Sequence, residues 1–287
     1  MNNKKPIGLV ADNGADLPQE FIDKNQIEVV FHQVYFPNEG FSSVDKINSC
    51  DFCKKAREMK EKNIFPKTSF AAMGAFKDAY QKALEKYEKI LAVIVTAKHS
   101  GAFNSASQAK SLMEEGNKIE VIDSALISTG QGILVVKIQE LIDQNKSVPE
   151  ILESVKLMKE KIRFFGFLED YSWLKSGGRI PGRLIDIMEA FQKRGVRMAL
   201  GMKDGKLGVR GIKFLAKDRV KAIVKELAKK KGISKIAIAH ADALPEAQRL
   251  KTELEKIGKE ILYVTDLTPV LIAHGGPGAL IVSYYSE

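Results

Sequence analysis

The chain has 287 residues, of which 45% are hydrophobic and 28% are charged, a composition typical of folded globular proteins. This length favours two domains, and a chain of this size folds without a metal ion or a disulfide framework. Two cysteines favour a reducing compartment, and no apolar run reaches the roughly 18 residues that span a membrane. The N-terminal segment is predicted to be a strand, not a signal peptide. We therefore expect a cytoplasmic protein.

Short runs rich in β-branched residues alternate with helical patterns along the chain. The predicted strands are 7–11, 27–35, 90–96, 119–122, 164–167, 235–240, 261–265, 270–274 and 279–284. The predicted helices are 70–89, 103–115, 131–143, 149–161, 217–230 and 245–257. In the first helix, Met73, Phe76 and Tyr80 recur every three or four residues and give one buried face. The alternation predicts an α/β fold built from βαβ units.

A domain boundary is predicted near residue 162. The helix predicted at 149–161 closes one α/β run, and a second run begins at Arg163. We therefore expect two α/β domains, residues 1–162 and residues 163–287. Small-molecule sites commonly lie between two such units, so a ligand-binding cleft is expected between them.

The formal net charge is +9, which suits a nucleic acid, an anionic membrane surface or an acidic protein partner. The lysines lie mainly on predicted helix faces such as 217–231, without the interleaved aromatic residues that stack on bases. A solvated lysine-rich surface explains this pattern more simply. We expect no nucleic-acid binding, and transient contact with an anionic membrane stays open.

The segment ILAVIVTAKHSGAFNSA predicts a strand, a tight turn and a helix, with Ser100 and Gly101 in the turn. Backbone N–H groups and the positive end of the helix dipole meet there and favour a carboxylate or a phosphate. Ser100 offers a hydroxyl group, and Gly101 permits close approach of the backbone. An ordinary helix cap with a turn glycine is the structural alternative.

Two further turns carry polar side chains. Thr68 and Ser69 directly precede a predicted helix, so one of them, more simply Ser69, is expected to cap it while the other faces a ligand. His274 ends a predicted strand and precedes a glycine-rich turn that starts at Gly275. A neutral imidazole there accepts or donates a hydrogen bond. The alternative for this histidine is a structural role.

The glycine-rich segment WLKSGGRIPGR has the spacing of a phosphate-binding loop at Gly177 and Gly182. Arg183 and Leu184 stand where that loop requires a lysine and a hydroxyl group. The segment also follows a helix-like stretch instead of a strand. We therefore reject a nucleotide-binding role for it.

Two other clusters have simple structural explanations. Asp12, Asn13 and Asp16 follow the first predicted strand and are compatible with magnesium, but turn and cap chemistry explains them more simply. Cys50 and Cys53 form a C-x-x-C pair without a second pair to complete a zinc site. We expect no metal site and no cofactor.

Taken together, the turns resemble those of the DegV family of bacterial fatty-acid-binding proteins. The resemblance covers nearly the whole chain, and its motifs occur in the same order. They are VADNGADLP near the start, P-K-T-S at 66–69, H-S-G-A-F-N-S-A at 99–106, V-I-D-S at 121–124, L-K-S-G-G-R-I at 174–180 and H-G-G-P-G-A at 274–279.

The resemblance implies two α/β domains with the acyl chain of a long, palmitate-like fatty acid buried between them. It also implies that the carboxylate is held by Thr68, Ser100 and His274. Supporting contacts are expected from Ser69, Gly101 and Gly275. Ala102 stands where the family usually has a threonine, and residues 70–73 replace a glutamine and prolines with apolar residues. The head-group region is therefore expected to be more apolar than in typical members.

Many DegV proteins resemble the B subunit of bacterial fatty acid kinase. The resemblance therefore implies a subunit without catalysis of its own, which presents the fatty acid to a separate kinase subunit. That kinase subunit makes the acyl phosphate from ATP. Within the basic segment 209–213, Arg210 is the expected contact with the kinase.

Two other functions stay open at this stage. One is a hydrolase or acyl transferase in which Ser100 is the nucleophile and His274 its base, although no orienting acid is evident. The other is a basic regulatory protein that binds DNA or another protein. The resemblance favours the fatty-acid carrier over both.

Overall fold

The computed structural model describes residues 4–37, 39–43, 47–215 and 218–287; the side chains of residues 41, 43 and 210–215 lie outside the description. The strands are β1 (Lys5–Asp12), β2 (Glu28–Val30), β3 (Gln33–Phe36), β4 (Gly40–Ser43), β5 (Lys67–Ser69), β6 (Tyr87–Ile94), β7 (Ile119–Asp123), β8 (Ile162–Phe167), β9 (Val196–Lys203), β10 (Lys206–Leu215), β11 (Ile233–His240), β12 (Ile261–Asp266) and β13 (Leu280–Ser286). The helices are α1 (Gln19–Asn25), α2 (Ser49–Glu61), α3 (Met73–Lys86), α4 (Ala102–Ser111), α5 (Ser128–Asp143), α6 (Val148–Lys161), α7 (Ser172–Gly177), α8 (Gly182–Lys193), α9 (Arg219–Ala228), α10 (Leu244–Lys256) and α11 (Pro269–Gly275).

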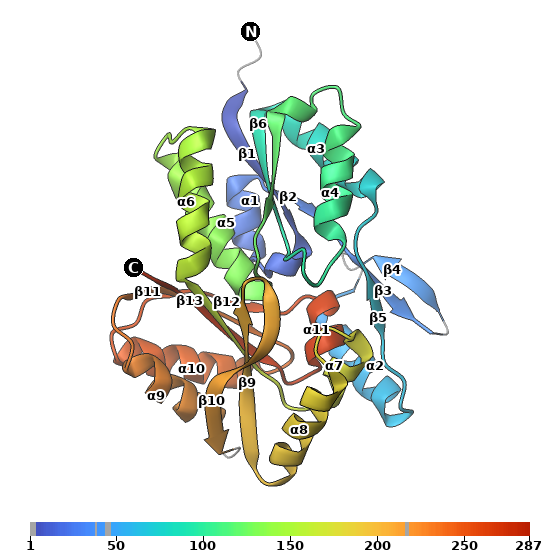
Figure 1. The fold of residues 1–287 in the computed structure, drawn as a ribbon, viewed down its shortest axis with the longest axis vertical. Coiled ribbons are helices and arrows are strands. Elements are labelled where there is room, and N and C mark those ends of the chain that lie inside the picture. Colours follow the sequence, from blue (N-terminus) through green and yellow to red (C-terminus); the bar gives the residue numbers. More distant parts are fainter. Residues whose placement is uncertain (1–3, 38, 44–46, 216–217) are drawn as a thin grey trace.

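The first sheet is parallel and has the strand order β2-β1-β6-β7. Its central strand β6 buries alternate side chains on opposite faces, as the period of a strand requires. Ile90 and Ala92 pack with α3 and α4, whereas Leu91 and Val93 pack with α5 and α6. Figure 1 shows these helices on the two sides of the sheet in the upper part of the molecule.

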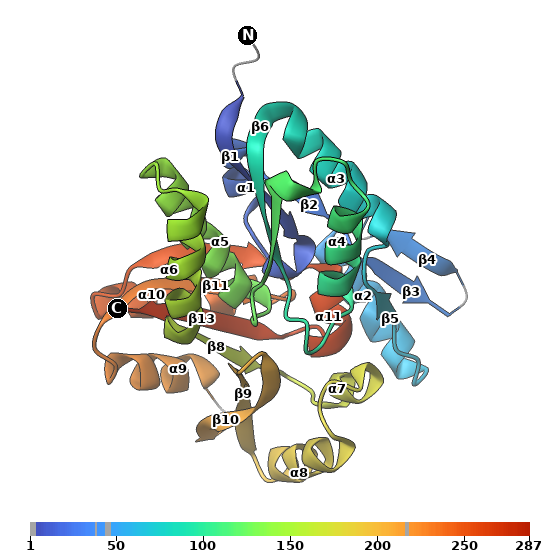
Figure 2. The same cartoon turned by 45° about the horizontal axis from the view of Figure 1, so that its top comes forward.

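The second sheet has the order β10-β9-β8-β13-β11-β12. Only the pair β11–β12 is parallel, and the other four pairs are antiparallel. The α/β class is therefore confirmed, but the expectation of βαβ units throughout is wrong for this half. Helices α9 and α10 cover one face through an apolar core that includes Ile223 and Leu250. Figure 1 shows both helices below β11 and β13, and Figure 2 shows α9 beneath the sheet.

A small third sheet, β4-β3-β5, lies beside α2 at the right of Figure 1. This third sheet lies before residue 162 in the sequence, but it packs into the core of the half of the molecule that contains the second sheet. Val34 and Phe52 belong to the same buried cluster as Trp173 and Ile272. Helix α6 ends at Lys161, immediately before β8. Residues before 162 contribute to the cores of both halves, the one around the first sheet and the one around the second. A division of the chain into two domains at residue 162 therefore stays a prediction.

Two predicted strands are wrong. The strand predicted at 27–35 is two strands in different sheets, because the chain leaves the parallel sheet between β2 and β3. The strand predicted at 270–274 is helix α11, which has a proline at its first position and Thr268 as its N-cap. Its short apolar run does not distinguish a strand from a buried helix. Among the described residues, no helix is long and apolar enough to cross a membrane.

The shared core makes a testable prediction about stability. Phe52 is 0% exposed and its ring lies 5.8 Å from that of Phe36, centroid to centroid. We expect Phe52→Ala to lower the free energy of unfolding by about 3 to 5 kcal/mol, measured by urea denaturation. The control Leu112→Ala removes a side chain that is 63% exposed and is expected to change it by less than about 0.5 kcal/mol. Equal losses in the two variants would contradict this packing.

Candidate functional site

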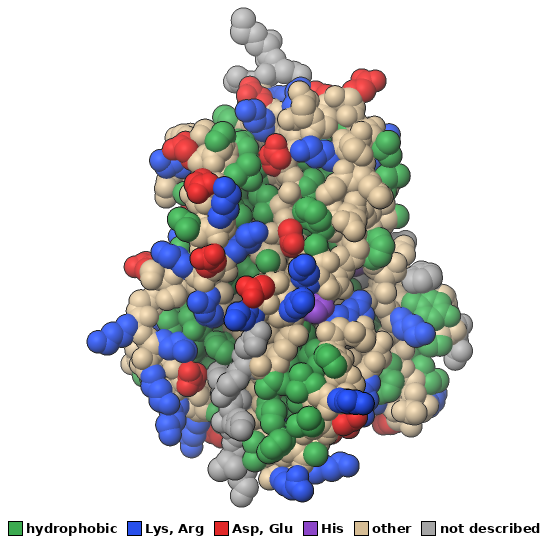
Figure 3. Space-filling view, in the orientation of Figure 1, with side chains coloured by type: hydrophobic (Ala, Val, Ile, Leu, Met, Phe, Trp, Pro, Cys, Tyr) green, Lys and Arg blue, Asp and Glu red, His purple; other side chains and the backbone are tan. Residues whose placement is uncertain are grey.

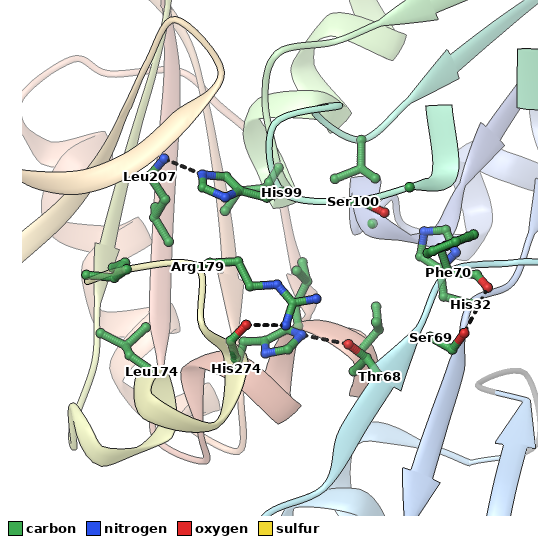
Figure 4. A pocket seen from close by; sticks show the side chains of 18 residues that line it. His32, Thr68, Ser69, Phe70, His99, Ser100, Leu174, Arg179, Leu207 and His274 are labelled. Carbon is green, nitrogen blue, oxygen red and sulfur yellow. Dashed lines mark hydrogen bonds between the residues drawn. The ribbon is translucent and has the colours of Figure 1, made fainter. Parts of the chain in front are cut away.

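A cavity of about 360 Å³ lies between the two halves of the molecule. One end is polar and contains the hydroxyl and imidazole groups of Thr68, Ser100 and His274 (Figure 4). The remaining wall is mainly apolar. Its aliphatic residues are Val95, Ile127, Leu174, Ile180, Leu207, Val270 and Leu271. The cavity therefore suits an elongated apolar molecule with one polar end.

Thr68 and His274 are brought together although 206 residues separate them. Thr68 lies in β5, and His274 lies in the last turn of α11. The hydroxyl oxygen of Thr68 is 2.8 Å from Nε2 of His274. Gly177 lies against the other edge of the ring, where an added Cβ would be only 2.8 Å from Nδ1. A side chain at position 177 would therefore displace the ring of His274 from this position.

The surroundings of His274 keep its imidazole neutral. Burial, followed by the nearby positive charge of Arg179, lowers its pKa to about 3. Nδ1 is buried and has no hydrogen-bond partner among the described residues. The proton is assigned to Nε2, because a proton on Nδ1 would be buried without an acceptor. Nε2–H then donates to Thr68, and the hydroxyl proton of Thr68 is available to a ligand.

Ser100 and Gly101 lie where sequence reasoning placed them, in the turn before α4. The hydroxyl oxygen of Ser100 accepts a hydrogen bond from the backbone N–H of Ala102 at 3.2 Å. Its own proton is therefore available to an acceptor in the cavity. Gly101 is the N-cap of α4, and the ring of Phe70 lies so close that an added Cβ would be 2.6 Å from it.

The supporting residues are placed differently. Ser69 lies in β5 and lines the cavity, but its hydroxyl donates to the carbonyl oxygen of Phe70 at 3.3 Å. The prediction that it caps the next helix is wrong, since α3 begins at Met73 without a side-chain cap. Gly275 packs against Leu168 and is not among the residues that line the cavity. Arg210 lies in β10, and its side chain falls outside the described residues.

Three lining residues were missed by sequence reasoning. Arg179 belongs to the segment that was rejected as a nucleotide loop, and Figure 4 shows its side chain reaching toward Thr68. His99 accepts a hydrogen bond at Nε2 from the backbone N–H of Leu207, at 2.6 Å. His32 is buried and accepts at Nδ1 from a backbone N–H at 3.1 Å. Arg179 and His99 lie within the family motifs, so their motif positions were the available signal.

The acidic turn after β1 has a structural role. Asp12 accepts hydrogen bonds from the backbone N–H groups of Gly14 and Val95 and from the side chain of Gln131, at 2.7 to 3.2 Å. These donors satisfy the buried carboxylate without a metal ion. Within the described part of the chain, no group of three or more His, Cys, Asp or Glu residues is arranged to hold a metal.

Comparison with known proteins places the chain among similar sequences over its whole length. The model of the family described as "Uncharacterised protein, DegV family" matches residues 6–287. A DegV domain-containing protein of Clostridium acetobutylicum is 28% identical over 285 residues, which cover 95% of this chain and 96% of that protein. A second such protein of the same organism is 31% identical over 208 residues, which cover 71% of each.

Solved structures have the same fold. A DegV family protein from Thermus thermophilus, described as binding fatty acid, has a TM-score of 0.84 and 24% identity, covering 98% of this chain and 100% of that one. DegV from Bacillus subtilis, described as a fatty acid binding protein, has a TM-score of 0.79 and 26% identity, covering 99% and 100%. The α/β architecture described above is thus shared with experimentally solved proteins.

The low pKa of His274 predicts a pH-dependent contribution to stability. The unfolded chain binds a proton on this residue near its ordinary value of 6.5, whereas the folded protein does so only near 3. Stability is therefore lost as the pH falls below about 6.5, and the loss continues down to about 3. We expect His274→Gln to lose less stability than the wild type over this range, measured by urea denaturation at several pH values. Parallel curves for the two proteins would contradict the assignment.

Proposed function

The chain belongs to the DegV family, and we propose that it binds a long-chain fatty acid in the cavity between its two halves. The acyl chain lies along the aliphatic wall, and the carboxylate lies at the polar end. The observation that carries this proposal is the pairing of Thr68 with His274 beside that wall. Relatives from Thermus thermophilus and Bacillus subtilis that share the fold are described as fatty acid binding.

The chemistry of the cavity suits both parts of a fatty acid. Each buried methylene group contributes roughly 0.8 kcal/mol, so an aliphatic wall supplies most of the affinity for a long chain. A carboxylate accepts hydrogen bonds only, and it must find donors when it leaves water. The hydroxyl groups of Thr68 and Ser100 are such donors, because each oxygen already accepts a hydrogen bond from another group. His274 acts through Thr68 as a positioning residue.

The departures from the usual family pattern lie next to this head-group site. Ala102 is fully buried at the start of α4, and Phe70 covers Gly101. We propose that the carboxylate is held with fewer hydroxyl donors than in typical members and that Phe70 shields it from water. Shielding strengthens the remaining hydrogen bonds, because they form at lower dielectric.

A hydrolase mechanism has less support. Nε2 of His274 is hydrogen-bonded to Thr68, not to Ser100. Its Nδ1 has no hydrogen-bond partner in the described part of the chain, whereas a catalytic base needs an acid or carbonyl there to orient it. We therefore propose a carrier without catalysis of its own.

The partner and the compartment are proposed on family resemblance. In this proposal the protein is cytoplasmic and presents its fatty acid to a separate fatty acid kinase subunit, which Arg210 helps to bind. The net charge of +9 is compatible with transient contact with an anionic membrane, where fatty acids partition.

Removing the hydroxyl of Thr68 tests the binding site. We expect Thr68→Val to weaken palmitate binding about 10- to 100-fold, because a hydrogen bond to a charged group contributes about 1.5 to 3 kcal/mol. Calorimetric titration with palmitate measures the affinity. Ser111→Ala, at the far end of α4, is the control and should bind as the wild type does. If delipidated wild-type protein takes up no fatty acid, the proposed function is wrong.

Ser100→Ala separates a carrier from a hydrolase. A carrier loses a hydrogen-bond donor, so we expect palmitate affinity to fall about tenfold. A hydrolase with Ser100 as nucleophile would keep its affinity for the ligand and lose ester turnover, which a chromogenic acyl ester detects. Turnover by the wild type that disappears in Ser100→Ala would refute the carrier.

The kinase proposal is tested by adding ATP and the catalytic subunit of a fatty acid kinase to the palmitate-loaded protein. Acyl phosphate is trapped with hydroxylamine and quantified. We expect Arg210→Ala to slow its formation about tenfold or more, as for a contact residue at a protein interface, and to leave the affinity for palmitate unchanged. Normal rates in this variant would remove Arg210 from the contact.

A further inference from the structure

Asp16 is a buried carboxyl group that ties three segments of the cavity wall together. Its two oxygens contact the hydroxyl of Ser128 at 2.6 Å and the backbone N–H of Thr268 at 2.8 Å. Each of these three residues lies within two positions of a residue that lines the cavity. Those lining residues are Gly14, Ile127 and Val270. The contacts of Asp16 therefore hold the wall together at the joint between the two halves.

The surroundings of Asp16 offer hydrogen-bond donors but no positive charge. The titratable groups that act on it are the carboxylate of Asp12, at the end of β1, and the hydroxyl of Tyr263, in β12. Burial raises the pKa of Tyr263 and keeps it protonated. Among the described residues, no lysine, arginine or histidine forms an ion pair with Asp16. Figure 3 shows charged side chains on the outer surface, where water solvates them, whereas Asp16 is 2% exposed.

Both protonation states of Asp16 make these contacts, but at different cost. In the ionised form the carboxylate accepts from Ser128 and Thr268, and its charge is buried without a counter-charge. In the neutral form the carboxyl O–H donates to the hydroxyl oxygen of Ser128, and the other oxygen still accepts from Thr268. Burial is the largest influence on the pKa of Asp16 and raises it to about 7, although both donors oppose this shift. The closed joint therefore favours the neutral form.

Opening of the joint reverses this preference. Water that reaches the carboxylate solvates its charge, and the pKa of Asp16 returns toward the ordinary value of 3.8. Opening is therefore coupled to the loss of a proton. Between pH 3.8 and about pH 7, each pH unit favours the open joint by up to about tenfold. Above that range Asp16 is ionised in both states, so a further rise in pH has no effect through this residue.

We propose that Asp16 is a proton-linked latch on the ligand cavity. In its neutral form it holds the segments that contain Ile127 and Val270 closed around the acyl chain. In its ionised form it lets these segments separate, so the ligand leaves faster as the pH rises. Asp16 and Ser128 have positive φ values of 44° and 52°, and this backbone strain is relieved when their contact opens. The latch rests on the proposed function, because it regulates release of the ligand from that cavity.

The test measures release of parinaric acid, an intrinsically fluorescent fatty acid, from the loaded full chain into excess phosphatidylcholine vesicles at several pH values. Asp16→Asn replaces the carboxylate with an uncharged side chain of the same shape. We expect the ratio of wild-type to variant release rates to rise several-fold per pH unit up to about pH 7 and to stay constant above it. The ratio removes the effects of the ligand's own titration and of His274, whose lowered pKa acts in the opposite direction.

Two further variants make the result specific to this contact. Asp143→Asn makes the same change at an exposed position of α5 and should release the ligand as the wild type does at every pH. Ser128→Ala removes a donor that lowers the pKa of Asp16, so the pH at which the release rate stops rising should move upward. Because Ser128→Ala keeps the carboxylate, it tests the latch even where Asp16→Asn fails to fold.

The outcomes separate this inference from the proposed function. If the wild type binds parinaric acid but the ratio of release rates does not change with pH, the latch is refuted and the carrier proposal stands. An unchanged pH profile in Ser128→Ala would refute it in the same way. A ratio that falls as the pH rises would show that the ionised form closes the joint, which also overturns the latch. If the wild type binds no parinaric acid, the proposed function fails first.

Discussion

The buried carboxylate of Asp16 joins the first half of the molecule to the helix that carries His274. It accepts hydrogen bonds from the hydroxyl of Ser128 at 2.6 Å and from the backbone N–H of Thr268 at 2.8 Å. Burial raises its pKa to about 7, and these two donors oppose that shift. Thr268 is the N-cap of α11. The position of His274 in the last turn of this helix therefore depends on the contact between Asp16 and Thr268.

The two side chains in this contact belong to residues with an unfavourable backbone conformation. Asp16 and Ser128 have positive φ values of 44° and 52°, a region that non-glycine side chains avoid. Ser128 begins α5 and is buried. Its hydrogen bond to Asp16 offsets the strain and fixes where α5 enters the interface. Thr129, the next residue, donates to Ser283 of β13 at 2.7 Å, which adds a second link between the halves.

In the candidate site, the hydrogen-bond donors are neutral groups, and the positive charge lies on a different residue. Thr68 and Ser100 are neutral donors, and His274 is held neutral by burial and by Arg179. The full positive charge lies on Arg179, which lines the same cavity. A neutral polar end suits a ligand that must enter and leave, because a direct buried ion pair would have a larger desolvation cost. The cation beside it adds long-range attraction for an anionic ligand.

The sequence by itself determined the α/β class, the strands and helices with clear periodicity, and three residues that line the polar end. It did not predict β4, β5, β9 and β10 or the helices α1, α2, α7 and α8. The correct predictions follow from local signals: β6 and α3 have clear periodicity, and the motifs around Thr68, Ser100 and His274 have characteristic residue types. Only the tertiary structure decided the rest. The run at 270–274 is a helix, and its N-cap residue Thr268 is held by Asp16, 252 residues away in the sequence. Arg179 and His99 line the site because segments that are far apart in the sequence lie together in the fold. No local sequence pattern predicts such a contact.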